Sequence, residues 1–175
     1  VVSGFQSIKS DNSKIIIAGG QENMSLAPHS IMIKDGLWDA FHNYHMGVTA
    51  ENVAEKFQIT RDEQDAFAVK SQKKALTAQK ENKFREEIIN LKIKSSKSEI
   101  DFNKDEHPRE GVNLETLSRL KPVFKKDGTV TAGNASGIND GAAAVVMMTD
   151  EEAKKKGISK LVSIKSWASC GVDPA

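Results

Sequence analysis

The sequence predicts an α/β protein in which a long, mainly helical subdomain is looped out of an α/β core. Two observations support this. Short runs of β-branched or small apolar residues, typical of buried strands, occur at residues 14–20 and 142–149. Roughly 100 residues rich in helix formers separate them, and the pattern strand, helix, strand returns near the end of the chain.

The first elements follow in order. Residues 14–20, "KIIIAGG", read as a buried strand that ends in a tight turn at two glycines. Residues 24–44 show no clear period, so we expect an irregular segment there. Residues 50–57 place Ala50, Val53, Ala54 and Phe57 on one helical face, which predicts a buried apolar stripe.

A second helix is expected from Arg61 to about Asn82. Thr60 and Glu63 have the spacing of a capping box, and Ala66, Val69 and Leu76 supply an inner stripe. The alternation in residues 87–93, "EIINLKI", predicts a strand. The polar residues 94–99, "KSSKSE", predict a solvated loop.

Turn and capping signals organise the rest of the chain. Residues 105–111, "DEHPREG", have turn chemistry, and a short helix is expected over 113–121. After the buried strand at 142–149, Thr149 and Glu152 form a second capping box for a helix that Gly157 can close. Residues 161–169 read as a closing strand.

Composition excludes several functional classes. The net charge is +1, so the overall balance suggests neither nucleic acid nor an anionic membrane as a partner. No apolar run approaches the ~18 residues that span a bilayer, and no signal peptide is visible. One cysteine fits a reducing compartment. Because the chain opens without Met, we expect it to be a piece of a longer protein.

The loop "AGNASG", residues 132–137, concentrates very small side chains. Such a run lets the main chain approach another object closely. That object is either a neighbouring helix or strand, or a slender ligand such as a pantetheine arm, with Ser136 or Asn134 offering a hydrogen bond. The residue types alone leave both readings open.

Five motifs in one order carry a resemblance to a known family: "AGGQENMS", "NYHMGVTAENVAEKF", "TRDEQDAFAVKSQKKA", "GTVTAGNASGINDGAAA" and "GVDP". Over essentially its whole length, the chain resembles the acetyl-CoA acetyltransferase branch of the thiolases. This implies the layered α-β-α-β-α thiolase fold, of which the chain would hold part of the N-terminal half. Residues 1–28 and 129–175 would be core elements, and 29–128 an inserted loop domain covering the coenzyme A site.

The resemblance also implies acyl transfer through a cysteine thiolate, with two oxyanion holes, an activating histidine and a second cysteine. We expect none of these residues within the chain: the nucleophile would lie just before Val1, and the other motifs beyond Ala175. Cys170 is expected to be a packed, non-catalytic thiol.

The residues that the resemblance assigns to coenzyme A are on the binding side. Ser136 would bond a pantetheine amide, Ala132 and Gly133 would form a close wall, and Phe124 and Leu37 would line the tunnel.

At the other end of the ligand, Arg109 would reach the nucleotide, and Thr116 and Leu117 would lie beside the adenine. His45 and Met46 would line the acyl pocket, in the form that resembles the short-chain type.

Further expectations follow. More than ten residues that relatives of this family carry in an assembly hairpin are lacking between Ser30 and Ile31. We expect the intact protein to contain this segment rather than to carry a deletion. We expect a homotetramer (a dimer of dimers) in the cytoplasm, using acetyl-CoA, acetoacetyl-CoA and CoA without a cofactor.

No spacing resembles a metal site, and His29, His42 and His107 are expected to be surface or capping residues.

The leading functional hypothesis is an acetyl-CoA C-acetyltransferase. Two alternatives stay open: a broad-chain 3-ketoacyl-CoA thiolase of fatty-acid β-oxidation, and a non-catalytic thiolase relative that binds acyl-CoA. A profile of activity against chain length separates the first two, and the sequence before Val1 separates the third.

Overall fold

A computed structural model describes residues 1–94 and 98–175 of the chain. These residues form two compact units. Unit 1 comprises Val1–Asp35 and Ile138–Asp173, and unit 2 comprises Gly36–Gly137 with Pro174–Ala175. The division into core and loop domain at 28/29 and 128/129 stays a prediction.

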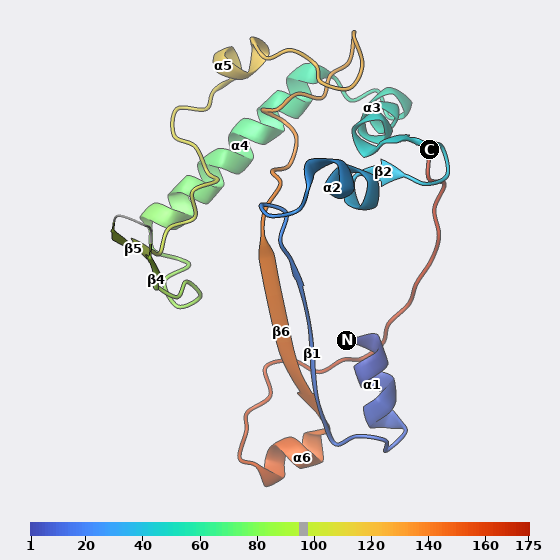
Figure 1. Cartoon of the computed structure of the whole chain (residues 1–175), viewed down its shortest axis with the longest axis vertical. Helices are drawn as coiled ribbons and strands as arrows, with labels where there is room; N and C mark the ends of the chain where they lie inside the picture. The colour runs from blue at the N-terminus through green and yellow to red at the C-terminus, as the bar shows by residue number, and fades with distance from the viewer. Residues whose placement is uncertain (95–97) are drawn as a thin grey trace. The chain divides into compact units, whose positions relative to one another are not determined.

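Unit 1 is built on an antiparallel two-stranded ribbon (Figure 1). Strand β1 (Ile15–Glu22) pairs along its whole length with β6 (Gly141–Met148). Helix α1 (Val2–Lys9) contacts both strands. A β-carbon on Gly4 would lie 3.2 Å from Ile16 Cγ2 and 3.4 Å from Met147 Sδ, so the small residue allows this close approach.

Both strands of this ribbon were predicted, but their predicted burial is wrong. Ile17 is 75% exposed and Val146 is 62% exposed. The runs of apolar residues are those of a strand covered on both faces. Among the described residues, however, α1 is the regular element that packs most extensively on the ribbon. The apolar pattern therefore identified strands correctly without showing what covers them here.

The C-terminal part of unit 1 follows the predictions in part. Helix α6 (Asp150–Lys155) begins at Thr149, whose hydroxyl accepts the Glu152 N–H at 3.1 Å, and it is followed by Gly157 at φ +66°. The closing strand predicted over 161–169 is wrong, because these residues form no regular structure. A strand needs a partner for its backbone N–H and C=O groups, and the described residues provide none.

The segment predicted to be irregular, 24–44, contains more order than expected. Helix α2 (His29–Gly36) occupies part of it, with Met32 buried. In unit 2, β2 (Trp38–Asp39) then pairs with β3 (Tyr44–His45). Positive φ at Asn43, +58°, permits the turn between them. No long hydrophobic period marks these short elements, which is why periodicity missed them.

The two longer helices of unit 2 are confirmed. They are α3 (Met46–Lys56) and α4 (Arg61–Lys80), the second with the full Thr60–Glu63 capping box. The apolar stripe predicted on α3 is wrong in detail: Phe57 and Val53 are exposed, and the buried residues of the helix are Ala54 and Glu51.

The remaining elements of unit 2 are short. The predicted strand at 87–93 begins only at β4 (Leu91–Lys94), which pairs with β5 (Glu99–Phe102). Of the loop predicted at 94–99, residues 95–97 lie outside the described residues. The helix predicted over 113–121 is α5 (Leu114–Ser118), which contacts α4.

The core of unit 2 combines apolar and polar side chains. Its buried members lie on α3, α4, α5 and the segment after α5, and they are Ala54, Val69, Leu117, Val130, Glu51, Asp65 and Thr131. Buried polar groups are costly unless they are hydrogen-bonded. The contacts that satisfy them therefore determine how the loop at 129–137 is held.

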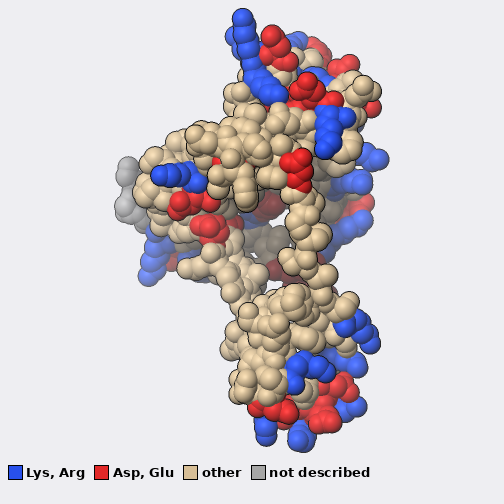
Figure 2. All heavy atoms as spheres, turned by 90° about the vertical axis from the view of Figure 1, so that its right-hand side faces the viewer, with Lys and Arg blue, Asp and Glu red and all other residues tan. Residues whose placement is uncertain are grey.

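The exposed surface is mixed in charge. Figure 2 shows basic and acidic side chains interspersed on the face in view. Within the described ranges, no helix is both long enough and apolar enough to cross a bilayer.

Candidate functional site

Residues 129–137, which we call the small-residue loop, are held to α3 by a buried carboxylate. Glu51, only 4% exposed, accepts hydrogen bonds from Val130 N at 2.8 Å, Thr129 N at 2.9 Å and Thr129 Oγ1 at 3.0 Å. Burial raises the pKa of Glu51, but the Thr129 and Val130 hydrogen bonds and the nearby charge of Lys125 outweigh it, so the pKa is lowered. The carboxylate is thus stabilised in its ionised form.

The same loop is held to α4 through Asn134. Its side-chain Nδ2 donates to Asp65 Oδ1 at 2.9 Å and to the Thr129 carbonyl at 3.0 Å, while its Oδ1 accepts Thr131 N at 2.8 Å. Asp65 also pairs with Arg61, Nε to Oδ2 at 2.8 Å. Because these bonds occupy both ends of its amide, Asn134 shapes the loop instead of offering a hydrogen bond to a ligand.

Ser136 and Ala132 differ from Asn134 in that both side chains are exposed. The described residues give the Ser136 hydroxyl no hydrogen-bond partner, whereas the other polar side chains of the loop, on Thr129, Thr131 and Asn134, are all bonded. Ser136 therefore presents a donor and an acceptor to solvent from an anchored main chain.

Gly133 faces protein on the side where a side chain would be. A β-carbon there would lie 2.5 Å from Leu117 Cδ2 and 2.6 Å from Leu120 Cδ1. Leu117 is buried in this contact. The small size of residue 133 is therefore explained by helix packing. Of the two readings left open for the loop, packing accounts for Gly133, while Ala132 and Ser136 remain open to a ligand.

Thr116 lies on α5 beside Leu117 and takes part in its N-terminal cap. Its Oγ1 accepts Asn113 N at 3.1 Å, and Asn113 Oδ1 accepts Thr116 N at 2.9 Å. The hydroxyl is therefore committed to the helix start.

A second group of predicted residues meets at the start of α3. The rings of His45 and Phe124 stack with centroids 4.7 Å apart. Met46 N donates to the Leu37 carbonyl at 2.8 Å. His45 caps α3 by accepting Gly47 N at Nδ1, 2.9 Å, which leaves Nε2 as the ring nitrogen available to another group. Met46 is half exposed.

Gly47 makes this arrangement sterically allowed, since a β-carbon there would overlap the Phe124 ring. We expect Gly47→Ala to lower the free energy of unfolding by about 1 kcal/mol net. Overpacking costs about 1–3 kcal/mol, and alanine's helix propensity returns up to about 1 kcal/mol. Urea unfolding measures this, with Gly20→Ala as the control because nothing lies within 4 Å of its β-carbon position. Equal stability of the two variants would contradict the packing.

Arg109 is held by its main chain, with its N–H donating to Gln72 Oε1 at 3.0 Å. Its guanidinium is exposed and has no ion-pair partner in the part of the chain that is described. No hydrogen bond, ion pair or ring contact among the described residues joins Arg109 directly to Ser136 or to the His45 group. The structure thus brings together two local sets: Leu37, His45, Met46 and Phe124 in one, and Leu117 with Gly133 in the other.

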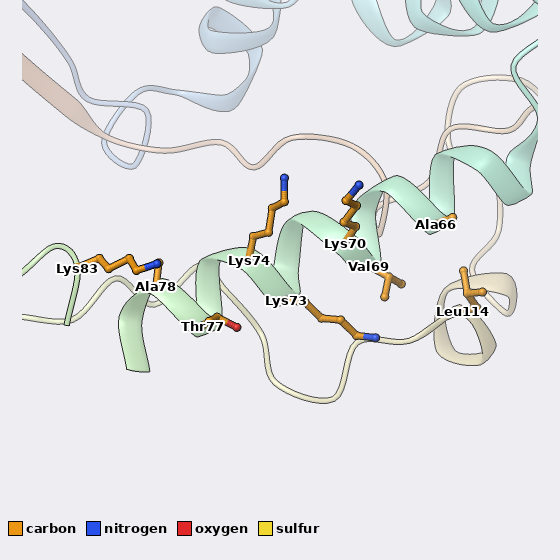
Figure 3. A pocket seen from close by; sticks show the side chains of 9 residues that line it. All are labelled: Ala66, Val69, Lys70, Lys73, Lys74, Thr77, Ala78, Lys83 and Leu114. Atoms are coloured by element: carbon orange, nitrogen blue, oxygen red, sulfur yellow. The ribbon is translucent and has the colours of Figure 1, made fainter. Parts of the chain in front are cut away.

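A separate groove of about 650 Å³ runs along α4 (Figure 3). Val69 and Leu114 contribute apolar surface, and Lys70, Lys73, Lys74 and Lys83 surround it. None of the predicted site residues lines it. Figure 3 shows Lys70 and Lys74 pointing to one side of the helix and Lys73 to the other, so the lysines do not converge on one point.

The chain also contains possible metal ligands and one thiol. Within the described ranges, no cluster of three or more His, Cys, Asp or Glu side chains is placed to hold a metal ion. Cys170 is exposed, so its predicted packing is wrong. It lies on the C-terminal segment without regular structure, where no element covers it.

Sequence reasoning missed the residues that hold the loop, above all Glu51 and Asp65. Both are acids on the inner face of a helix, beside the residues of a predicted apolar stripe. An acid in such a position is a signal of a buried hydrogen-bonded carboxylate, and it was available in the sequence.

Known proteins match this chain over nearly its whole length. Residues 28–151 match the family description "Thiolase, N-terminal domain". The chain is 50% identical over 190 residues to an acetyl-CoA acetyltransferase of Rhizobium meliloti (strain 1021), covering 99% of this chain and 48% of that protein. It is 52% identical to that of Paracoccus denitrificans, covering 99% of this chain and 49% of the relative. The chain therefore spans about half the length of these relatives.

A solved structure of a related protein has a similar fold. The crystal structure of the Bacillus anthracis acetyl-CoA acetyltransferase superposes with a TM-score of 0.79 at 40% identity, covering 90% of this chain and 44% of that one. This confirms the predicted α/β thiolase fold. The 190-residue alignment also exceeds the 175 residues present, which leaves room for the segment expected between Ser30 and Ile31; its position stays a prediction. On the family match, the identity and the fold together, the chain belongs to the thiolase family.

Proposed function

We propose that the protein carrying this chain is an acetyl-CoA C-acetyltransferase, which reversibly condenses two acetyl-CoA into acetoacetyl-CoA and CoA. The observation that carries the proposal is the 50–52% identity to acetyl-CoA acetyltransferases over 99% of the chain. Acyl transfer of this kind uses a cysteine thiolate. We do not assign that role to Cys170, which is exposed on a segment without regular structure.

In this proposal the pantetheine arm lies along the small-residue loop. The Ser136 hydroxyl bonds one of its amides, and Ala132 forms the wall that the arm passes. Two observations support this role: both side chains are exposed, and the main chain that carries them is held by Glu51 and Asn134. Anchored groups bind with a smaller loss of conformational entropy than mobile ones.

The remaining predicted residues are assigned to the tunnel and to the acyl and nucleotide ends of the ligand. His45 and Met46 line the acyl pocket, and Leu37 and Phe124 line the pantetheine tunnel. The Arg109 guanidinium, exposed and without an ion-pair partner among the described residues, meets the nucleotide end. Thr116 and Leu117 lie near the adenine. Because the Thr116 hydroxyl caps α5 and Leu117 is buried, we expect the ends of these two side chains to contribute little to CoA binding. The inserted segment 29–128 covers this site.

We further propose a cytoplasmic homotetramer that needs no cofactor beyond its coenzyme A thioester substrates and no metal, and that binds neither nucleic acid nor membrane. The single cysteine supports a reducing compartment. The mixed charge of the surface in Figure 2 gives no single-sign face for a polyanion in that view.

Thiolysis of acetoacetyl-CoA by the intact protein tests the proposal. We expect turnover of acetoacetyl-CoA to exceed turnover of six-carbon and longer 3-ketoacyl-CoA. Comparable or faster turnover of the longer thioesters would identify a broad-chain 3-ketoacyl-CoA thiolase instead. Binding of acetyl-CoA without turnover of any thioester would identify a non-catalytic relative.

Ser136→Ala is expected to weaken CoA binding by about 1 kcal/mol, the value of one neutral hydrogen bond. This corresponds to a rise of about fivefold in KM for CoA. Steady-state thiolysis with varied CoA measures it. The control is Ser118→Ala, because the Ser118 hydroxyl bonds the Glu115 carbonyl on the outside of α5. Unchanged KM in Ser136→Ala would contradict the assignment.

A further inference from the structure

One side chain from a distant segment lies directly on the residue after Ser136. A β-carbon built on Gly137 would overlap the imidazole of His107, with Nδ1 at 2.8 Å and Nε2 at 3.1 Å. The ring therefore occupies the space that any side chain at position 137 would need. His107 is exposed, as expected for a surface residue. Nothing in its local sequence indicates this contact, which joins residues 30 positions apart.

The segment that carries His107, residues 105–109, is fixed to α4 at both ends; we call it the strap. Gln79 Nε2 donates to the Asp105 carbonyl at 3.0 Å, and Arg109 N donates to Gln72 Oε1 at 3.0 Å. Gln72 and Gln79 are seven residues apart, about two helical turns, so they lie on one face of α4.

The strap also has an internal constraint. His107 N donates to Asp105 Oδ1 at 3.0 Å. The following residue, Pro108, has a fixed φ and also restricts the backbone dihedrals of His107. The His107 ring is thus carried on a short, tethered turn rather than on a freely moving loop.

Ser136 lies between two anchors that both lead back to α4. On one side, Asn134 is bonded to Asp65 of α4 at 2.9 Å. On the other, Gly137 lies against His107 of the strap, which Gln72 and Gln79 of α4 hold. The Ser136 hydroxyl itself has no bond to the described residues. The position of Ser136 is therefore set by residues on either side of it. Hydrogen bonds hold Asn134, and the imidazole of His107 lies against Gly137.

We propose that His107 is a positioning residue for coenzyme A binding: by filling the space above Gly137, it sets where the Ser136 hydroxyl meets the ligand. This rests on the proposed function. His107 needs no contact with the reacting atoms, so it acts on binding and not on the acyl-transfer step. The same contact favours glycine at position 137, because a β-carbon there would displace the exposed imidazole.

A double-mutant cycle in the intact protein tests the contact. The variants are His107→Ala, Gly137→Ala and the double variant, with KM for CoA and kcat measured in acetoacetyl-CoA thiolysis. We expect each single variant to raise KM about fivefold to tenfold with kcat within about twofold. In the double variant, Gly137→Ala adds little, because removal of the ring leaves room for the new β-carbon.

Two further variants separate positioning from general loss of structure. His107→Phe keeps a ring of similar size and is expected to retain a KM near that of the wild type. His42→Ala, at another exposed histidine, which pairs with Asp39 at 2.8 Å, is the matched control and should leave KM unchanged. Three results would each overturn the inference while wild-type kinetics uphold the proposed function. They are an unchanged KM in His107→Ala or in Gly137→Ala, multiplicative effects on KM in the double variant, and loss of CoA binding in His107→Phe. Absence of CoA binding and turnover in the wild type would overturn both.

Discussion

Replacing Glu51 with alanine is expected to lower the free energy of unfolding by about 3–5 kcal/mol, among the largest effects of any single change in unit 2. The variant leaves the buried Val130 N–H and the Thr129 N–H without the acceptor that they now share at 2.8 and 2.9 Å. Each buried donor left without a partner costs about 1–3 kcal/mol. A cavity in place of the side chain adds to this cost.

Urea unfolding of the intact protein measures the change. Glu51→Gln keeps an acceptor oxygen and the size of the side chain, so it should lose less than Glu51→Ala. Glu55→Ala is the matched control one turn away. The Glu55 side chain is 81% exposed, and its ion pair with Lys125 is long, at 3.7 Å. Similar losses in Glu51→Ala and Glu55→Ala would contradict the anchoring role.

The same carboxylate predicts a pH dependence. The pKa of Glu51 is lowered in the folded protein: burial raises it, and the hydrogen bonds from Thr129 and Val130 more than offset this. A group with a lowered folded pKa binds its proton more tightly in the unfolded chain. Its stabilising contribution is therefore complete above the unfolded pKa of a glutamate and is lost as the pH falls through the folded pKa. Stability of Glu51→Gln should fall less steeply than that of the wild type across that range.

Ala132→Leu is expected to reduce kcat/KM for acetoacetyl-CoA thiolysis by about 100-fold, on the proposed function. The loop cannot retreat from a larger side chain, because the Glu51 and Asn134 bonds hold its main chain on either side of residue 132. The added atoms therefore enter the space assigned to the pantetheine arm. Since Ala132 is exposed, stability should be unaffected.

Thiolysis kinetics and thermal unfolding of Ala132→Leu check this together. Ala50→Leu, at an exposed alanine of α3 outside the proposed site, serves as the control for the added bulk. Normal activity of Ala132→Leu would show that no ligand passes this wall. Lowered stability would show that residue 132 is packed against protein.

Local chemistry decided what could be predicted from sequence. Thr60 with Glu63 starts α4 as expected, and Gly157 at φ +66° follows α6, because caps and positive φ depend on a few neighbouring residues. The family assignment was equally accessible, since collinear motifs need no structure. The binding roles of Ser136 and Ala132 remain predictions that come from that resemblance.

Tertiary structure alone decided which side chains are covered and by what. The apolar runs of β1 and β6 indicate strands, but the exposure of Ile17 shows that an apolar run does not determine its own burial. Glu51 is buried because Thr129 and Val130, almost 80 positions away, donate to it. The small size of Gly133 and Gly137 serves Leu117, Leu120 and His107, which approach from other segments. Sequence thus determined the capped starts of α4 and α6, the strands β1 and β6, and the family, because these depend on neighbours along the chain. The partners of the buried acids and glycines depend on contacts through space.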